Sequence, residues 1–151
     1  MTSLELKSSS FSDGDEIPKK YGYKHGNENP PLSINGITSE TKSLVLIMDD
    51  PDAKAAVGKI WVHWVICNID PNTTEIPESY SLQNTINGKN DFGELGYGGP
   101  APPDKRHTYI FKLYALDIKL DLQNGVTKDQ VENAMEGHIL EQAILKGTYA
   151  P

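Results

Sequence analysis

Three short polar stretches stand out in this chain of 151 residues because each lies within or beside an apolar segment. Asp50 and Asp52 flank a proline directly after the apolar run SLVLIMD. His63 lies inside the stretch IWVHWVICNID, and His107 is followed two residues later by Tyr109. A carboxylate beside an imidazole stabilises its protonated form, and imidazole N–H and phenol O–H groups can bind an anion. These residue types therefore predict acid–base or anion-binding chemistry, provided that the fold brings the three stretches together.

Each of these residues also has an ordinary structural explanation. Asp50 and Asp52 can cap a turn, because aspartate side chains hydrogen-bond to the backbone of nearby residues. A single histidine in an apolar strand, such as His63, is typically a core residue whose hydrogen bonds are satisfied. His107 and Tyr109 can belong to a cross-strand polar pair, although residues two apart in a strand share one face and can meet the same ligand. Residue spacing alone leaves both interpretations open.

The stretch GYGGPAPP comes shortly before His107 and contains Gly98, Gly99 and Pro100. Glycines let backbone amides approach a ligand closely, and successive amides in a turn can form an anion-binding nest. The alternative is a loop stiffened by its prolines. Cys67 lies in an apolar strand, where burial would make its thiol a poor nucleophile.

Apolar runs and turn signals predict the elements that must position these residues. Strands are expected over Ser43–Asp49, Ile60–Ile69 and His107–Asp117, which are rich in β-branched and aromatic residues. An edge strand is expected within 3–11 and a short strand within 81–86. The rest of 71–106 shows little periodicity, which is typical of a functional loop region; contact with a partner stays open.

Alternation along the strands assigns side chains to faces. In the second strand one face is expected to carry Trp61, His63, Val65 and Cys67, and the other Val62, Trp64 and Ile66. In the third strand one face is expected to carry His107, Tyr109, Phe111 and Leu113.

Residues 127–147, TKDQVENAMEGHILEQAILKG, are expected to form one helix. Thr127 and Gln130 match a capping box, apolar residues recur near helical spacing, and Gly147 suits a C-terminal cap. Gly137, inside the pattern, is the feature that argues against a continuous helix.

Composition excludes several classes of protein. The formal net charge of −7 disfavours a nucleic-acid partner. A single cysteine rules out a disulfide within the chain and fits a reducing compartment. The N-terminal residues lack a signal-peptide pattern, and no run approaches the roughly 18 apolar residues of a membrane span. We therefore expect a single cytoplasmic domain over residues 1–151 that is not an integral membrane protein.

Taken in order, LVLIMDDPDA, WVHWVICNI, YGGPAPPDKRHTYIFKLYALD and GHILEQAILKGTY resemble the phosphatidylethanolamine-binding protein (PEBP) family. FSDGDEIPKKYG and NPPLSI also match, so the resemblance covers nearly the whole chain. The compact length resembles the prokaryotic branch, which is similar to the Raf kinase inhibitor proteins. The resemblance implies a mostly β fold. In it a large sheet packs on a smaller one as a Greek-key sandwich, with a few peripheral helices including one near the C-terminus.

The resemblance also implies a pocket for small anions such as phosphate, acetate or a phospholipid headgroup. Carried over by motif, its ligand-binding residues are Asp50, Asp52, His63, Gly98, Gly99, Pro100, His107 and Tyr109. The two histidines and the tyrosine are expected to donate hydrogen bonds to the anion, with the Gly98 and Gly99 amides adding more. The aspartates are expected to orient the histidines or to meet a cationic ammonium group.

We therefore expect a non-enzymatic binding protein for phosphate or a headgroup such as phosphoethanolamine, with no catalytic residue, no metal and no cofactor. The alternative is an inhibitor of a serine protease or a kinase, since the family includes both kinds. An enzyme with a histidine–aspartate general base is the third hypothesis, and no activated nucleophile or metal signature supports it. Resemblance to prokaryotic relatives allows a homodimer. The sequence names neither the physiological ligand nor a protein target.

Overall fold

The computed structural model describes residues 3–79 and 84–151. In chain order its elements are β1 (Glu5–Lys7), the 3₁₀ turn η1 (Lys19–Tyr21), β2 (Leu32–Asn35), β3 (Ser43–Asp50), α1 (Ala53–Val57), β4 (Trp61–Ile69), β5 (Glu75–Ile76), β6 (Ile86–Asn87), β7 (His107–Leu116), α2 (Lys128–Met135) and β8 (Ile139–Tyr149). The three long strands predicted from the sequence correspond to β3, β4 and β7. The fold is mostly β, as expected.

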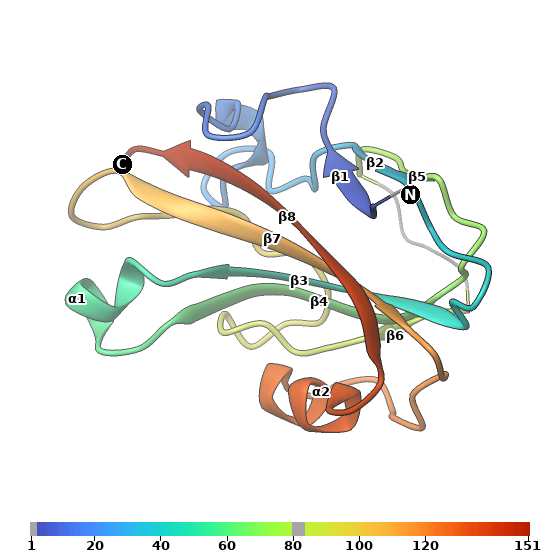
Figure 1. Ribbon diagram of the computed structural model, residues 1–151. Helices are drawn as coiled ribbons and strands as arrows, with labels where there is room; N and C mark the ends of the chain where they lie inside the picture. The colour runs from blue at the N-terminus through green and yellow to red at the C-terminus, as the bar shows by residue number, and fades with distance from the viewer. Residues whose placement is uncertain (1–2, 80–83) are drawn as a thin grey trace.

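The strands form two antiparallel sheets, a large one in the order β6-β4-β3-β7-β8 and a small one in the order β1-β2-β5. After β3, β4 and β6 the chain crosses back to place β7 beside β3. The resulting spatial order, β7-β3-β4-β6, is the Greek key that the resemblance implies. Figure 1 shows the small sheet over one face of the large sheet and α2 against the other.

Two apolar layers pack on the two faces of the large sheet. The layer beneath the small sheet includes Leu46, Met48, Trp64, Phe111 and Leu113. The layer between α2 and the large sheet includes Val45, Ile47 and Val65 from the sheet and Val131 and Met135 from α2. Strand β3 contributes to both layers and is buried at every position. This double coverage explains why its sequence is a continuous apolar run rather than an alternating one.

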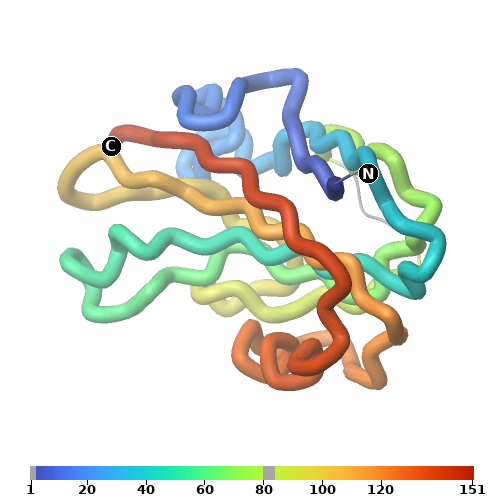
Figure 2. Tube along the Cα trace, in the orientation of Figure 1, coloured from blue at the N-terminus to red at the C-terminus, as the bar shows by residue number. Residues whose placement is uncertain are grey.

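The helix predicted over 127–147 is correct only for its first part. It ends at Met135, and Gly137 adopts a left-handed conformation with φ of 82°. The chain then extends as β8, which runs beside β7 along its length (Figure 2). Gly147 is therefore no helix cap. A Cβ atom there would lie 2.5 Å from the Ile17 side chain, so the strand needs glycine at this point of close packing.

The alternation predicted for β4 is wrong at the start of the strand because of a β-bulge. Met48 pairs with Trp64, but the next residue of β3, Asp49, pairs with Val62, which leaves His63 as an extra residue on β4. An extra residue reverses the alternation on one side of it. Val62 therefore packs in the same layer as Val65, beneath α2, and His63 turns to the opposite side of the sheet.

The shorter expected strands are only partly present. β1 occupies the middle of the strand expected within 3–11. The strand expected within 81–86 falls partly on residues 80–83, which lie outside the described residues, and β6 begins at its last position. β5 and β6 are the only named elements in the described part of 71–106.

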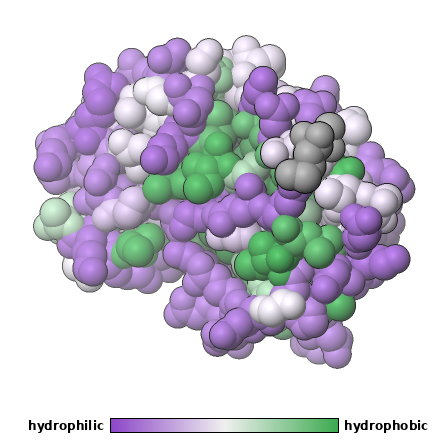
Figure 3. Space-filling view, in the orientation of Figure 1, coloured by the Kyte–Doolittle hydropathy of each residue, from purple (hydrophilic) through white to green (hydrophobic). Residues whose placement is uncertain are grey.

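The surface carries mixed polarity. Figure 3 shows hydrophobic groups set between hydrophilic ones on the face that β8 crosses. Exposed apolar residues on β8 are Ile139, Leu140 and Ile144. Among the described residues, no helix is both long and apolar enough to cross a bilayer.

We expect Thr127→Ala to lower the free energy of unfolding by about 1 kcal/mol. The Thr127 side chain accepts a hydrogen bond from the Gln130 amide, and the Gln130 side chain accepts one from the Thr127 amide. Alanine breaks this reciprocal cap at the start of α2. Urea denaturation measures the loss. Thr127→Ser keeps the hydroxyl and is the control; an equal loss in both variants would mean that the methyl group matters rather than the cap.

Candidate functional site

A small cavity of about 220 Å³ opens where β3 ends and where β4 and β7 begin. Both β4 and β7 are antiparallel to β3, so their first residues lie beside the last residues of β3. The cavity is lined by Asp50, Ala53, Val57, Trp61, His63, Phe92, Ala101, Pro103, His107 and Tyr109. The fold thus brings four of the eight predicted residues together in its wall: Asp50, His63, His107 and Tyr109.

His63 is almost fully buried, and its Nδ1 atom lies 2.6 Å from the carbonyl oxygen of Gly98. A carbonyl oxygen only accepts hydrogen bonds, so Nδ1 carries the proton and Nε2 of the neutral ring is an acceptor. Burial lowers the pKa of His63 to about 4, which keeps the ring neutral near pH 7. The expectation that His63 donates to an anion is therefore corrected, because the nitrogen left for a ligand carries a lone pair.

Aromatic rings form one wall of the cavity. The His63 ring packs edge-on against Phe92 and Tyr109, with ring centroids 5.6 Å and 5.1 Å away. Phe92 also packs edge-on against Trp61 and stacks on Tyr23, 3.9 Å between centroids. The buried His63 ring is held in place by these contacts as well as by its hydrogen bond.

His107 lies between two carboxylates. Its Nδ1 is 2.6 Å from Asp50 Oδ2, and its Nε2 is 2.7 Å from Asp104 Oδ1. Ionised carboxylate oxygens only accept hydrogen bonds, so with both carboxylates ionised the two ring nitrogens carry protons and the ring is an imidazolium. Burial opposes this charge, but the hydrogen bonds with Asp50 and Asp104 outweigh burial and raise the pKa of His107. Neither N–H group is free for an anion while both carboxylates stay in place.

Asp50 is the buried member of this arrangement, with its side chain 4% exposed. Burial raises the pKa of its carboxyl group, and the hydrogen bond with His107 opposes that rise. Its other oxygen, Oδ1, accepts from the Asp52 amide at 3.0 Å. The preceding residue, Asp49, is bound instead by Lys112 and Lys128, at 3.1 Å and 2.7 Å. Neighbouring aspartates at the end of β3 therefore serve separate ion pairs.

Tyr109 is fully buried, and within residues 3–79 and 84–151 its hydroxyl makes no hydrogen bond of good geometry, although the Asp50 carboxylate and the Ala101 backbone lie near enough to influence its pKa. Burial, and next the charge of Asp50, raise the pKa of the phenol, so that it keeps its proton. Leaving a buried hydroxyl without a hydrogen bond destabilises the folded protein by on the order of 1–3 kcal/mol. In the wall of a cavity, this O–H group is a donor available to a bound acceptor.

The remaining predicted residues support the cavity without lining it. Asp52 Oδ2 accepts from the Thr108 amide at 2.8 Å and so ties the loop after β3 to the start of β7. The Gly98 amide donates to the His63 carbonyl oxygen, and the Gly99 amide donates to Asn27 Oδ1, each at 2.8 Å. Both amides already have acceptors, so they are not free donors for an anion as the sequence had suggested.

The glycine–proline loop is fixed against the segment after η1. The Pro100 carbonyl oxygen accepts from the Tyr23 amide at 2.9 Å. A Cβ atom on Gly99 would lie 2.0 Å from the Tyr21 carbonyl oxygen, so only glycine allows this close approach. The loop can therefore present the Gly98 carbonyl oxygen to His63 at a defined position.

Of the contributors to the site that were not predicted from the sequence, Asp104 and Phe92 are the most informative. Asp104 lies three residues before His107, and a carboxylate so near a candidate histidine was a usable signal. Phe92 lies within 71–106, where no periodicity marks a residue as buried or exposed. Only the fold shows that it reaches the cavity.

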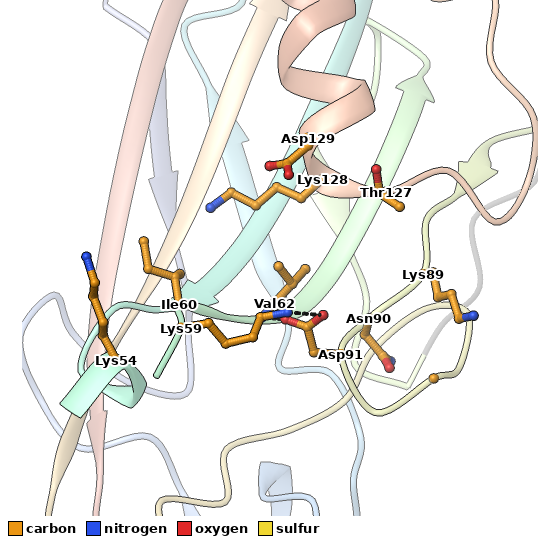
Figure 4. Close-up of a pocket in the computed structure, with 11 residues that line it drawn as sticks. Lys54, Lys59, Ile60, Val62, Lys89, Asn90, Asp91, Thr127, Lys128 and Asp129 are labelled. Carbon is orange, nitrogen blue, oxygen red and sulfur yellow. Dashed lines mark hydrogen bonds and ion pairs between the residues drawn. The ribbon is translucent and has the colours of Figure 1, made fainter. Parts of the chain in front are cut away.

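A second, larger hollow of about 600 Å³ lies at the start of α2 and contains lysines (Figure 4). Lys59 is paired with Asp91 at 3.0 Å, and Lys128 is paired with Asp49. In Figure 4 the amino groups of Lys54 and Lys89 lie at opposite sides of the hollow. These charges do not converge on one point, so the candidate site remains the smaller cavity.

The lining of the smaller cavity offers carboxyl, imidazole, phenol and apolar groups. It contains no serine, threonine or cysteine among its described residues. Burial raises the pKa of Cys67 to about 12, which makes its thiol unreactive. Over the described ranges, no group of three or more histidine, cysteine or acidic side chains is arranged to hold a metal ion.

A family model described as phosphatidylethanolamine-binding protein matches residues 7–150. A UPF0098 protein from Methanothermobacter thermautotrophicus is 47% identical over 151 residues, which cover 97% of this chain and 98% of that protein. A UPF0098 protein from Chlamydia muridarum is 46% identical over 148 residues, with the same coverage.

Solved structures share the fold over almost the whole chain. CT736 from Chlamydia trachomatis matches with a TM-score of 0.92 and 42% identity, covering 99% of this chain and 98% of that one. YbcL from E. coli, described as a member of the mammalian PEBP family, matches with a TM-score of 0.89 and 27% identity. That match covers 97% of each chain.

The buried neutral His63 predicts an acid-dependent loss of stability. Its pKa is about 4 in the folded chain and about 6.5 when exposed, so the unfolded chain binds more protons between these values. Stability is therefore fully present above pH 6.5 and is lost as the pH falls toward 4. The His63 contribution to this loss between pH 7.5 and pH 4.5 is about 2.5 kcal/mol.

Urea denaturation of the parent and of His63→Gln at both pH values measures this contribution. The other titrating groups are common to both proteins, so the difference between their pH dependences belongs to His63. Identical pH dependences would show that His63 does not need to stay neutral in the fold.

Proposed function

The chain belongs to the phosphatidylethanolamine-binding protein family, and we propose that it is a non-enzymatic binding protein whose small cavity takes a phosphate group, free or in a phospholipid headgroup. Three groups in the cavity wall carry this proposal: the Tyr109 hydroxyl, the His107 imidazolium and the His63 ring. Each offers a different kind of interaction, and together they define the chemistry of the ligand.

The proposal mainly rests on the buried Tyr109 hydroxyl, which makes no hydrogen bond of good geometry in the described part of the chain. A buried O–H group gains most from an acceptor that bears negative charge, since charge-assisted hydrogen bonds are the stronger ones. A phosphate oxygen in the cavity would remove the cost of the unsatisfied donor. Nearby, His107 supplies a positive charge at the same wall.

The neutral His63 ring restricts the ligand further. Because Nδ1 donates to Gly98, the ring can only accept at Nε2. A ligand that fills the cavity therefore needs a donor as well as an acceptor. A protonated phosphate oxygen supplies one, and so does the ammonium group of an ethanolamine headgroup, which would also be attracted by the carboxylates at this wall.

Binding rather than turnover is supported by the kinds of side chain present. The described lining contains no nucleophile, and both nitrogens of His107 are occupied by carboxylates, so this ring is not poised to take a proton from water. The alternative role, inhibition of a serine protease or a kinase, stays a prediction. Incubating the purified protein with panels of both enzyme classes and measuring their activity tests it.

We expect Tyr109→Phe to weaken binding of inorganic phosphate and of glycerophosphoethanolamine by roughly ten- to a hundredfold, because it removes one hydrogen bond to a charged group. Titration calorimetry measures both dissociation constants. Tyr114→Phe is the matched control, since Tyr114 lies on the same strand but packs in the layer beneath α2. Equal binding by Tyr109→Phe and its parent would contradict the proposal.

We also expect binding of glycerophosphoethanolamine to weaken as the pH rises. Its phosphodiester keeps one negative charge throughout the neutral range, so the change reports on the protein. Burial lowers the pKa of His107, but the hydrogen bonds with Asp50 and Asp104 raise it above the ordinary value, so binding should persist to a higher pH than an ordinary histidine would allow and decline above the raised pKa. In His107→Gln the decline should be absent; a decline that persists there would assign the pH dependence to another group.

A further inference from the structure

We propose that Asp104 occupies, from within the chain, the place of the ligand's negatively charged oxygen at His107 Nε2, so that a ligand binds by exchanging with this carboxylate. The inference rests on the function proposed above and makes Asp104 a residue that sets which anions can bind.

The two carboxylates at His107 differ in how firmly they are held. The Asp50 side chain is 4% exposed, stands at the end of β3 and accepts a second hydrogen bond from the Asp52 amide. The Asp104 side chain is 41% exposed and lies in the turn that leads into β7. In the described part of the chain, His107 is its only side-chain partner. Asp104 can therefore leave the ring without opening the core, whereas Asp50 cannot.

The position of Asp104 fits such an exchange. It directly follows Pro103, and both Pro103 and His107 line the cavity. His107 therefore lies between the cavity that it lines and the segment that carries Asp104, which bonds to its Nε2 atom. An anion in the cavity that reaches the Tyr109 hydroxyl meets the same wall of the sheet, because Tyr109 and His107 are two residues apart on one face of β7.

Charge gives a second reason for exchange. Asp50, Asp104 and the His107 imidazolium together carry a net charge of −1, which opposes the entry of an anion. When Asp104 swings outward into solvent, the pair that remains is neutral and one charged N–H donor becomes free. The incoming oxygen then takes over the hydrogen bond that Asp104 gives up.

This arrangement discriminates between anions. Because Asp104 is part of the chain, its carboxylate competes for His107 at a high effective concentration. A monocarboxylate from solution would only replace this one hydrogen bond with an equivalent one, so it gains nothing by binding. A phosphate group has further oxygens that can accept from Tyr109, and a proton or an ammonium that can bond to His63. Asp104 therefore excludes acetate-like anions while admitting phosphate or a phosphate-containing headgroup.

Substitution of Asp104 tests the exchange. We expect Asp104→Ala to bind both inorganic phosphate and glycerophosphoethanolamine about tenfold more tightly than the parent, and to bind acetate where the parent does not. Asp104→Asn keeps an amide oxygen that can still accept from Nε2–H, so its gain should be smaller. Asp121→Ala removes an equal charge from an exposed loop near α2 and should leave binding unchanged. The two phosphate ligands distinguish a free phosphate from a headgroup.

Titration calorimetry gives the dissociation constants, and NMR titration of the His107 ring shows whether its pKa falls when Asp104 is removed. Equal or weaker phosphate binding by Asp104→Ala would overturn the exchange, and if the parent still binds phosphate through Tyr109, the proposed function would stand. If neither the parent nor Asp104→Ala binds phosphate or glycerophosphoethanolamine, the proposed function fails with it. An unchanged pKa of His107 would mean that Asp104 does not bond to the ring in solution.

Discussion

The hydrogen bond between Asp50 and His107 is the interaction on which the rest of the site depends. It joins the end of β3 to the start of β7, and both side chains are almost fully buried. A buried charge is tolerated only when it is paired, so each of these residues fixes the other's charge and position. This pair fixes the orientation of the His107 ring in the cavity wall. It thereby also places the second ring nitrogen where the exposed Asp104 can bond to it.

The sandwich fold makes the pair attainable because β3 is covered on both faces. Side chains that alternate along β3 must enter one apolar layer or the other, and its two terminal aspartates are no exception. Asp49 meets two lysines on the side of α2, and Asp50 meets a histidine on the side of the small sheet. Each carboxylate is compensated within its own layer, which keeps the cavity's chemistry separate from the lysine-lined hollow at the start of α2.

Much of this site was predictable from the sequence. His107 and Tyr109 share a face because β7 is regular, and the DPD motif lies near them because β3 and β7 are antiparallel neighbours. Resemblance to a family identified the remaining members. The simple alternation of side chains along a strand predicted the wrong face for His63. The reason is a β-bulge, which is a property of strand pairing and leaves no clear mark in the residues themselves.

Other features depend on contacts that no local pattern contains. The end of α2 is set by Gly137, whose left-handed conformation a helical pattern does not reveal, and by the free edge of β7, which pairs with the residues that follow. The proton positions on the two histidines follow from their partners, a carbonyl oxygen for His63 and two carboxylates for His107. Two residues of the same type therefore differ in charge within one cavity, His63 being neutral and His107 protonated.

The bulge in β4 also constrains how this protein can change during evolution. A strand normally accepts substitutions more readily than it accepts a change in length. Here, loss of one residue between Trp61 and Trp64 would restore regular alternation and turn the imidazole away from the cavity while the apolar core of the strand stayed in register. A relative that keeps this pocket is therefore expected to keep two residues between the tryptophans, the second of them the histidine. The identity of the first residue is less constrained.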